Sequence, residues 1–311
     1  MISLTSDTLK LFDLPDCERA QACMRDVFIM FPAAMAAEDH AKALLSLPRC
    51  NSNAGMSLIA LPGQGKSTLG MEWMRQSQQP SSGWPGKLIY INILENPMNV
   101  HVEKLLLSQI GKIFCGHPLT LSYRDIGKAQ DIILENNVRG VFLDETPFLL
   151  RCKDPKESQL MSIIGLSEGN WPLNFILSGP TIPMNKVFDA NPVLSTRYFD
   201  RVSELPVLCK NNDFFGLVAG IMERMPLRSE SELDKYFMEK LLELTRTKIS
   251  YGKITIDYSP LRTVSNLLRE TCRQAVVDGT EFINAQGLVE MQKKMRGYYN
   301  SKVYRERYYR T

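Results

Sequence analysis

The segment that most constrains the fold of this 311-residue chain is an apolar run that leads directly into a glycine-containing loop. The run Met56–Ala60 is followed by the sequence LPGQGKS, which ends at Ser67. A buried strand, a loop with glycines at Gly63 and Gly65, and a final Lys-Ser pair match the loop that cradles phosphate groups. The glycines let backbone N–H groups turn toward an anion, and the next helix directs the positive end of its dipole at the same charge. We call residues 60–67 the phosphate loop, and it predicts a nucleotide-binding α/β domain.

Within the phosphate loop we expect Lys66 to reach the β- and γ-phosphates of ATP, and Ser67 to ligate Mg²⁺. Ala60 stands where the pattern usually has its first glycine, which is one departure from it. A glycine-containing turn that binds nothing is the alternative interpretation. The residues expected to contact the nucleotide are Pro62, Gly63, Gln64, Gly65, Lys66, Ser67 and Thr68.

Short apolar runs recur along the chain and predict a buried parallel sheet. They are mostly too apolar to have a solvated face, and longer helical patterns suited to crossover helices separate them. The five runs are Met56–Ala60, Leu88–Ile93, Gly140–Asp144, Leu173–Ser178 and Val202–Leu208. After Pro206 the strand-like runs all but stop, and helical periodicity takes over. We therefore expect a five-stranded parallel α/β sheet with flanking helices, followed by a small helical domain.

A second motif, RGVFLDE, ends one of these predicted strands in two carboxylates. Asp144 would lie at the carboxyl edge of the sheet, where it can hold Mg²⁺ through water, and Glu145 beside it can act as base for an attacking water. A strand that ends in a solvated acidic turn is the alternative. Together with the phosphate loop, the Asp-Glu pair predicts an ATPase rather than a phosphotransferase, which would not need the glutamate.

Two further positions are candidates for sensing or stabilising the γ-phosphate. Ser178 ends the strand before Gly179-Pro180, and a polar side chain there can report on the nucleotide. Asn174 is the less favoured alternative, and a plain Ser-Gly turn is the other. Arg197 and Arg201 precede the last predicted strand, although a lone arginine is often an ordinary surface charge.

Phosphate loop, Asp-Glu strand, polar-ended strand, arginine and helical lid, in this order, resemble an AAA+ ATPase. Within that superfamily the chain resembles the TniB/TnsC transposition regulators over roughly residues 52–292, through the segments ALPGQGKST, VFLDE, FILSGP and LSTRYFDR. The resemblance implies that Arg197 is an arginine finger offered to the neighbouring subunit's nucleotide. It implies that Arg262, in SPLRTVSNLLRE, is a lid arginine that contacts nucleotide in cis. It also implies assembly on duplex DNA as a ring or helical filament, with a transposase and a target-selection adaptor protein as partners.

The resemblance further implies that DNA lies in a central pore, contacted by residues between the two nucleotide motifs. Contacts of this kind go to phosphates and give affinity without sequence preference. Charges scattered over helix faces are also typical of ordinary solvated surface. The candidate DNA-binding residues in this part of the chain are Lys104, Lys112, Ser122, Arg124 and Lys128.

The last 19 residues combine basic side chains with tyrosines. The whole chain has a formal charge of +3, yet residues 293–311 hold seven Lys or Arg and a single acid, Glu306. Five of the 11 tyrosines also lie here, and Tyr with Arg is a composition that anchors protein interfaces. We favour a hook for the transposase over a DNA-binding arm, and a frayed terminus is the third possibility.

These observations divide the chain into four expected regions. They are a helical N-terminal extension (1–51), the AAA+ domain (52–208), a helical lid (209–292) and the basic, tyrosine-rich tail (293–311). Seven dispersed cysteines without a C-x-x-C pair predict reduced thiols and no zinc site. The longest apolar run, residues 27–37, is too short for a membrane span, and a signal peptide is not recognisable. We expect a cytoplasmic protein without a membrane partner.

The leading hypothesis is an ATP-dependent, duplex-DNA-binding regulator that oligomerises on target DNA and recruits or activates a transposase, with slow, assembly-dependent hydrolysis. A replication initiator or loader is the first alternative, although the residues after 250 are few for a lid plus the winged-helix domain that such proteins usually add. A small-molecule kinase is disfavoured by Glu145, the arginines and the lid. An ATP-binding scaffold with little hydrolysis is disfavoured by the intact set of Lys66, Ser67, Asp144 and Glu145.

Overall fold

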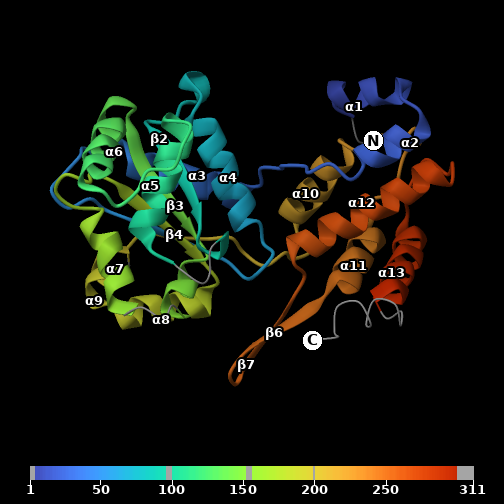
Figure 1. Cartoon of the computed structure of the whole chain (residues 1–311). Coiled ribbons are helices and arrows are strands. Elements are labelled where there is room, and N and C mark those ends of the chain that lie inside the picture. Colours follow the sequence, from blue (N-terminus) through green and yellow to red (C-terminus); the bar gives the residue numbers. More distant parts are fainter. Residues whose placement is uncertain (1–3, 96–99, 152–155, 199, 300–311) are drawn as a thin grey trace. The chain divides into compact units, whose positions relative to one another are not determined.

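The computed structural model describes residues 4–95, 100–151, 156–198 and 200–299, which form two units (Figure 1). One unit is the continuous stretch Pro32–Pro206, and the other joins the residues up to Phe31 to those from Val207 onward. The sequence predicts a single N-terminal extension over residues 1–51. In the structure this segment is divided at Phe31, so its two parts belong to different units.

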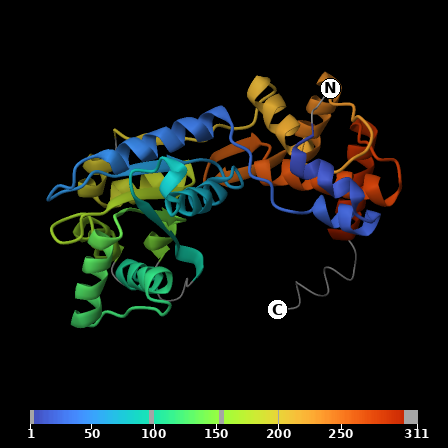
Figure 2. The same ribbon diagram turned by 90° about the horizontal axis from the view of Figure 1, so that it is seen from above.

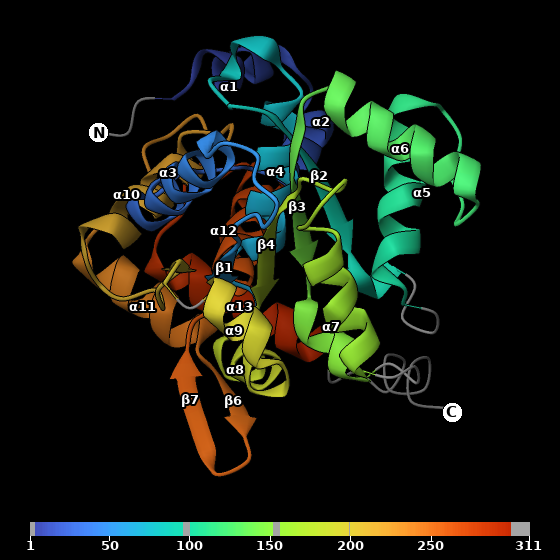
Figure 3. The same ribbon diagram turned by 90° about the vertical axis from the view of Figure 1, so that its left-hand side faces the viewer.

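The first unit, here the α/β unit, is built on a five-stranded sheet with strand order β2-β3-β4-β1-β5 (Figure 3). All neighbouring strands are parallel. The strands are β1 (Met56–Ile59), β2 (Lys87–Asn92), β3 (Val138–Asp144), β4 (Asn174–Gly179) and β5 (Val202–Glu204). The predicted five-stranded parallel sheet is confirmed. Strands β3 and β4 are almost wholly buried, which explains their continuous apolar sequences.

Helices cover both faces of this sheet, as the view from above shows (Figure 2). Val141 of β3 belongs to the core formed with the later helices, whereas its neighbour Phe142 contacts Trp73 of α4 on the opposite face. Leu45 of α3 packs over Gly140 on that same face as Phe142. One layer is therefore α3 (Pro32–Ser46) with α4 (Lys66–Ser77). The other comprises α5 (Val102–Phe114), α6 (Tyr123–Glu135), α7 (Lys156–Gly165), α8 (Thr181–Ala190) and α9 (Pro192–Tyr198).

The second unit, here the helical unit, has one core to which both ends of the chain contribute. Ala20 and Cys23 from the N-terminal segment pack in the same cluster as Phe214 and Val264. Its helices are α1 (Ser6–Lys10), α2 (Asp16–Ala22), α10 (Asn212–Met222), α11 (Lys235–Thr245), α12 (Leu261–Val277) and α13 (Ala285–Tyr299). Helix α13 continues past the predicted start of the tail, and residues 300–311 of the tail lie outside the described residues. Across the described ranges, no helix is long and apolar enough to cross a membrane.

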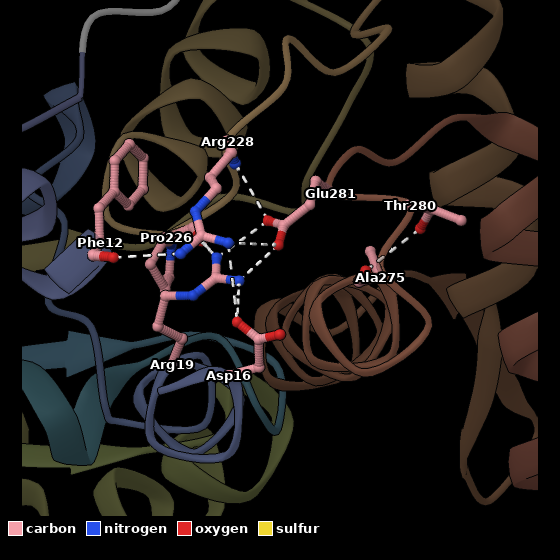
Figure 4. A network of polar contacts seen from close by, with 8 residues as sticks. All are labelled: Phe12, Asp16, Arg19, Pro226, Arg228, Ala275, Thr280 and Glu281. Carbon is pink, nitrogen blue, oxygen red and sulfur yellow. Dashed lines mark hydrogen bonds and ion pairs between the residues drawn. The ribbon is translucent and has the colours of Figure 1, made fainter. Parts of the chain in front are cut away.

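A buried arginine fastens α2 to the rest of the helical unit (Figure 4). The Arg19 side chain is fully buried and donates to the carbonyl oxygen of Pro226 at 2.9 Å and to Asp16 at 2.7 Å. It also donates to both carboxylate oxygens of Glu281. Arg228 lies 3.5 Å from Glu281 and 3.7 Å from Asp16. We call Asp16, Arg19, Arg228 and Glu281 the Arg19 network, in which two cations balance two anions.

The helical unit also contains a β-hairpin that the sequence analysis missed. Strands β6 (Thr247–Tyr251) and β7 (Ile254–Tyr258) pair antiparallel around a two-residue loop, and Figure 1 shows them extending from the end of α11. The expectation that strands all but stop after Pro206 is therefore wrong here. Gly252 opens the loop with φ +63°, a value suited to a tight hairpin turn. The alternation of polar and apolar residues was present, but it spans only five residues on each side of the loop.

Candidate functional site

The phosphate loop connects β1 to the first turn of α4. Gly63 and Gly65 have φ +78° and +92°, a left-handed conformation that glycine adopts without steric cost. The Lys66 ammonium donates to the carbonyl oxygens of Ala60 at 3.0 Å and Leu61 at 3.3 Å. The loop therefore wraps around its own lysine at the N-terminus of α4, where the helix dipole favours an anion. Ala60, the departure from the glycine pattern, is fully buried at the strand end.

Asp144, the last residue of β3, is fully buried and accepts three hydrogen bonds. Its Oδ1 accepts from the Ser178 hydroxyl and from the backbone N–H of Glu145, both at 3.0 Å. Its Oδ2 accepts from the Tyr90 hydroxyl at 2.8 Å. All three donors are neutral, and no ion pair to Asp144 occurs among the described residues. We call Tyr90, Asp144, Glu145 and Ser178 the Asp144 network, and its net charge is not balanced by a cation within it.

Glu145 follows Asp144 in an unusual backbone conformation. Its φ of +58° is left-handed, which is uncommon for a residue with a side chain. The turn brings its own N–H back to Asp144 and leaves the side chain partly exposed. Backbone strain of this kind is concentrated at functional sites, where the surrounding structure enforces it. The conformation is consistent with the predicted role of Glu145 as a base.

Tyr90 is the member of this network that the sequence analysis missed. It lies on β2 opposite Phe142 of β3, so both residues and Asp144 share one face of the sheet. Burial, together with the negative charge of Asp144, raises the pKa of Tyr90, which keeps its hydroxyl protonated as a donor.

The structure thus gathers Lys66, Ser67, Asp144, Glu145 and Ser178 at the carboxyl edge of the sheet. Asn174, the alternative to Ser178, lies at the opposite end of β4 and donates to the carbonyl oxygen of Ala54 at 2.8 Å. This placement favours Ser178 over Asn174 as the sensor candidate, and its role stays a prediction.

Arg197 lies away from the carboxyl edge of the sheet in its own subunit. Its guanidinium forms an ion pair with Glu168, which pairs with Ser52 shortly before β1. The next residue, Tyr198, packs against Gly55 at the amino end of the same strand. The phosphate loop follows the other end of β1, and this four-residue strand spans about 13 Å at roughly 3.3 Å per residue. Arg197 therefore does not reach the phosphate loop of its own subunit.

The remaining arginine candidates differ in their surroundings. Arg201 is exposed just before β5. Arg262 is exposed in the first turn of α12 and belongs to the helical unit.

The candidate DNA-binding residues all lie on or beside α5 and α6, which pack together. Lys104 and Lys112 are exposed on α5, and Arg124 and Lys128 are exposed on α6. Ser122 has a structural task, because its hydroxyl caps α6 by accepting from the Asp125 N–H at 3.1 Å. The four basic side chains are thus available to a polyanion, and their role in DNA binding stays a prediction.

No protein-family model matches the chain, and no curated protein matches its sequence. Solved structures do match its fold. The ORC2 protein of Aeropyrum pernix, solved in ADPNP and ADP complexes, aligns with a TM-score of 0.64 at 16% identity, covering 88% of this chain and 71% of that one. The ORC1 protein of the same organism, solved with DNA, aligns with a TM-score of 0.61 at 14% identity, covering 89% and 69%. Cdc6p from Pyrobaculum aerophilum aligns with a TM-score of 0.58 at 14% identity, covering 88% of this chain and 70% of that one.

The chain has the AAA+ fold. This conclusion rests on the ORC and Cdc6 similarities and on the parallel sheet with its flanking helices. It confirms the fold predicted from the motifs. The narrower resemblance to TniB/TnsC regulators rests on the sequence motifs and stays a proposal.

Two structural features show that the residues at the carboxyl edge of the sheet fit a magnesium–nucleotide complex. The phosphate loop has the left-handed glycines that aim backbone N–H groups at an anion. Asp144 is a buried carboxylate with neutral partners only, and an uncompensated buried charge is costly unless a cation accompanies it. Oxygen ligands such as the Asp144 carboxylate and the Ser67 hydroxyl are the type that Mg²⁺ prefers.

Proposed function

We propose that the chain is an ATPase that binds duplex DNA when loaded with nucleotide and works as an assembly of identical subunits. The observation that carries the proposal is the fully buried Asp144, held by neutral donors at the same sheet edge as the phosphate loop. Lys66 and the loop N–H groups would hold the phosphates, and Ser67 and Asp144 would hold Mg²⁺. The metal would neutralise phosphate charge there.

In this proposal Glu145 accepts the proton of the attacking water, and its left-handed backbone directs it out of the strand. Ser178 links the γ-phosphate region to Asp144 through its 3.0 Å hydrogen bond. Arg262 would contact the nucleotide from the lid, as the family resemblance implies.

The position of Arg197 supports hydrolysis across a subunit interface. Arg197 is at the amino edge of its own sheet, so it can stabilise transition-state charge only in a neighbouring subunit. It would have to leave Glu168 to do so. We therefore propose a ring or filament whose hydrolysis is slow in isolated subunits.

A mixing experiment tests this proposal. Arg197→Ala should bind ATP and hydrolyse it poorly, and Lys66→Ala should not bind ATP. Mixing the two should restore part of the turnover at interfaces that combine an intact arginine with an intact loop. Isolated subunits that hydrolyse ATP as fast as the assembly would contradict the proposal, and recovery with Arg201→Ala instead of Arg197→Ala would reassign the finger.

Two biological roles fit such an ATPase. The fold similarities to ORC and Cdc6 proteins support a replication initiator or loader. The sequence resemblance supports a TniB/TnsC regulator that recruits a transposase through its tail and takes its target from an adaptor protein. The structural comparisons favour the first role, and the motifs LSTRYFDR and FILSGP favour the second.

Truncation distinguishes the two roles. Helix α13 extends to Tyr299, so removing only residues 300–311 keeps every helix and core residue that the structure describes. A transposition regulator truncated there should hydrolyse ATP and coat DNA yet lose transposase in pull-down assays. Retained transposase binding would remove the tail from that role, and loss of DNA coating would instead make the tail a DNA-binding arm.

In either role, affinity for duplex DNA should fall steeply with salt. Neutralising Lys112 or Lys128 should weaken binding to all DNA sequences alike.

A further inference from the structure

Tyr90 contacts one of the residues proposed to hold the metal ion. Asp144 is the last residue of β3, and its Oδ2 accepts a 2.8 Å hydrogen bond from the Tyr90 hydroxyl on β2. Neither the phosphate loop nor the Asp-Glu motif contains Tyr90. The contact therefore links Asp144 to a residue that lies 54 positions earlier in the chain.

The direction of this hydrogen bond follows from the chemistry of the carboxylate. An ionised carboxylate can only accept, so the Tyr90 hydroxyl donates its one proton to Asp144 Oδ2 over 2.8 Å. The other carboxylate oxygen, Oδ1, accepts from the Ser178 hydroxyl and from the Glu145 N–H, both at 3.0 Å. Among the described residues, Tyr90 is thus the donor that orients Oδ2.

The ring of Tyr90 is held by packing that involves β3, the strand that carries Asp144, and helix α4. It stacks on Phe142 with ring centroids 5.7 Å apart, and Phe142 meets Trp73 of α4 edge-on at 5.9 Å. Gly70 of α4 makes room for this packing, because a Cβ there would lie 2.6 Å from the Phe142 ring. The position of the hydroxyl is therefore fixed by packing between β2, β3 and α4.

We propose that Tyr90 is a positioning residue that orients Asp144 toward the metal ion of the magnesium–nucleotide complex, an inference that rests on the proposed function. Tyr90 acts through its hydrogen bond to Asp144 and does not itself ligate the metal. Partners of this kind orient metal ligands, and their loss lowers metal affinity by about 10–100-fold.

The test is nucleotide affinity with and without the metal. Tyr90→Phe keeps the ring and removes the hydroxyl. Titration calorimetry with a slowly hydrolysed ATP analogue should show affinity reduced by about 10–100-fold in Mg²⁺ and unchanged in EDTA. Tyr198→Phe is the matched control, because Tyr198 is a buried tyrosine of the same unit packed at the amino end of β1. It should leave both affinities unchanged.

A double variant tests whether Tyr90 acts through Asp144. In an Asp144→Asn background, Tyr90→Phe should cause little further loss of magnesium-dependent affinity, since the two residues form one unit. Equal losses in Mg²⁺ and EDTA would show a packing role and overturn the inference. Unchanged or tighter binding in Mg²⁺ would also overturn it, the latter by showing that the hydroxyl competes with the metal. Wild-type protein that binds no nucleotide in either condition would instead contradict the proposed ATPase function itself.

Discussion

Glu145 in the α/β unit and Glu281 in the helical unit share a rare backbone conformation, with φ of +58° and +59°. Each lies in a network around a fully buried charge. At Glu281 that charge is Arg19, and the surrounding carboxylates of Asp16 and Glu281 balance it. At Glu145 the buried charge is Asp144, and its partners are two hydroxyls and a backbone N–H.

The comparison shows that strain alone does not identify a catalytic site. A left-handed glutamate occurs in both networks, yet the buried charge of Arg19 is paired with opposite charges, whereas the hydrogen-bond donors to Asp144 are all neutral. The Arg19 network explains how the N-terminal segment is attached to the helical unit, and it leaves no charge for a ligand. Among the described residues, Asp144 is a buried carboxylate without an ion pair, which is the property expected where a cation binds.

The largest expected effect distinguishes the two glutamates by activity. Glu145→Gln should lower ATP turnover by at least about 100-fold, because a lost general base costs that much or more. ATP binding should persist, as measured by calorimetry alongside a steady-state phosphate-release assay. Glu281→Gln is the matched control and should hydrolyse ATP at a rate close to wild type under conditions where it is folded. Near-normal turnover by Glu145→Gln would remove this residue from the mechanism.

The next effect distinguishes the networks by stability. Arg19→Met should lower the free energy of unfolding by about 3–5 kcal/mol, because it leaves the Glu281 carboxylate without its buried partner. Urea unfolding followed by circular dichroism measures the change. Arg75→Met is the control, because Arg75 pairs with Glu72 on an exposed helix surface, and such pairs contribute little. Similar unfolding curves for both variants would show that the Arg19 network does not stabilise the helical unit.

In the candidate site, the residues that could be predicted from the sequence are those that lie close together along the chain. The phosphate loop and the VFLDE segment each carry their residues within a few positions, so their placement at a strand end followed from local pattern. Tyr90 lies 54 residues from Asp144, and its contact depends on the register of β2 against β3. Register is set by packing across the whole sheet, which one strand's sequence does not encode.

The Arg19 network shows the same limit more strongly. Arg19 and Glu281 are 262 residues apart and come together only because α2 packs on α12. The sequence predicts helices in both places, and it contains no local signal that pairs them. The fold class was therefore accessible from periodicity and motifs, whereas the assignment of the first 31 residues to the helical unit was not.

A smaller effect concerns the cost of keeping Asp144 charged. Asp144→Asn has nearly the same shape and can keep the bonds from Ser178 and the Glu145 N–H, while the Tyr90 hydroxyl can turn to accept. Removing an uncompensated buried charge should leave the free energy of unfolding within about 1 kcal/mol of wild type or raise it. Thermal unfolding without nucleotide measures this. A loss as large as that of Arg19→Met would mean that Asp144 is balanced by a cation within the fold.

The smallest effect is a dependence on pH that should belong to the helical unit. Hydrogen bonds from Arg19 lower the pKa of Glu281 below its usual value, and the charges of Arg19 and Arg228 act in the same direction. The unfolded chain therefore binds a proton at this glutamate more readily than the folded chain does. The resulting stabilisation is fully present above the unfolded-state pKa of about 4.3, and it is lost as the pH falls through the lower folded-state value.

Glu281→Gln tests this assignment, because it removes the titrating group and keeps most of the side-chain shape. The variant should be less stable than wild type at pH 7, and the difference in free energy of unfolding should shrink as the pH is lowered below about 4. Urea unfolding of the full chain at a series of pH values measures both curves. Asp16 keeps some acid dependence in the variant, because Arg19 lowers its pKa as well. A difference that stays constant from pH 7 to pH 3 would show that the Glu281 carboxylate is not the titrating group, and the charge balance inferred for the Arg19 network would then be wrong.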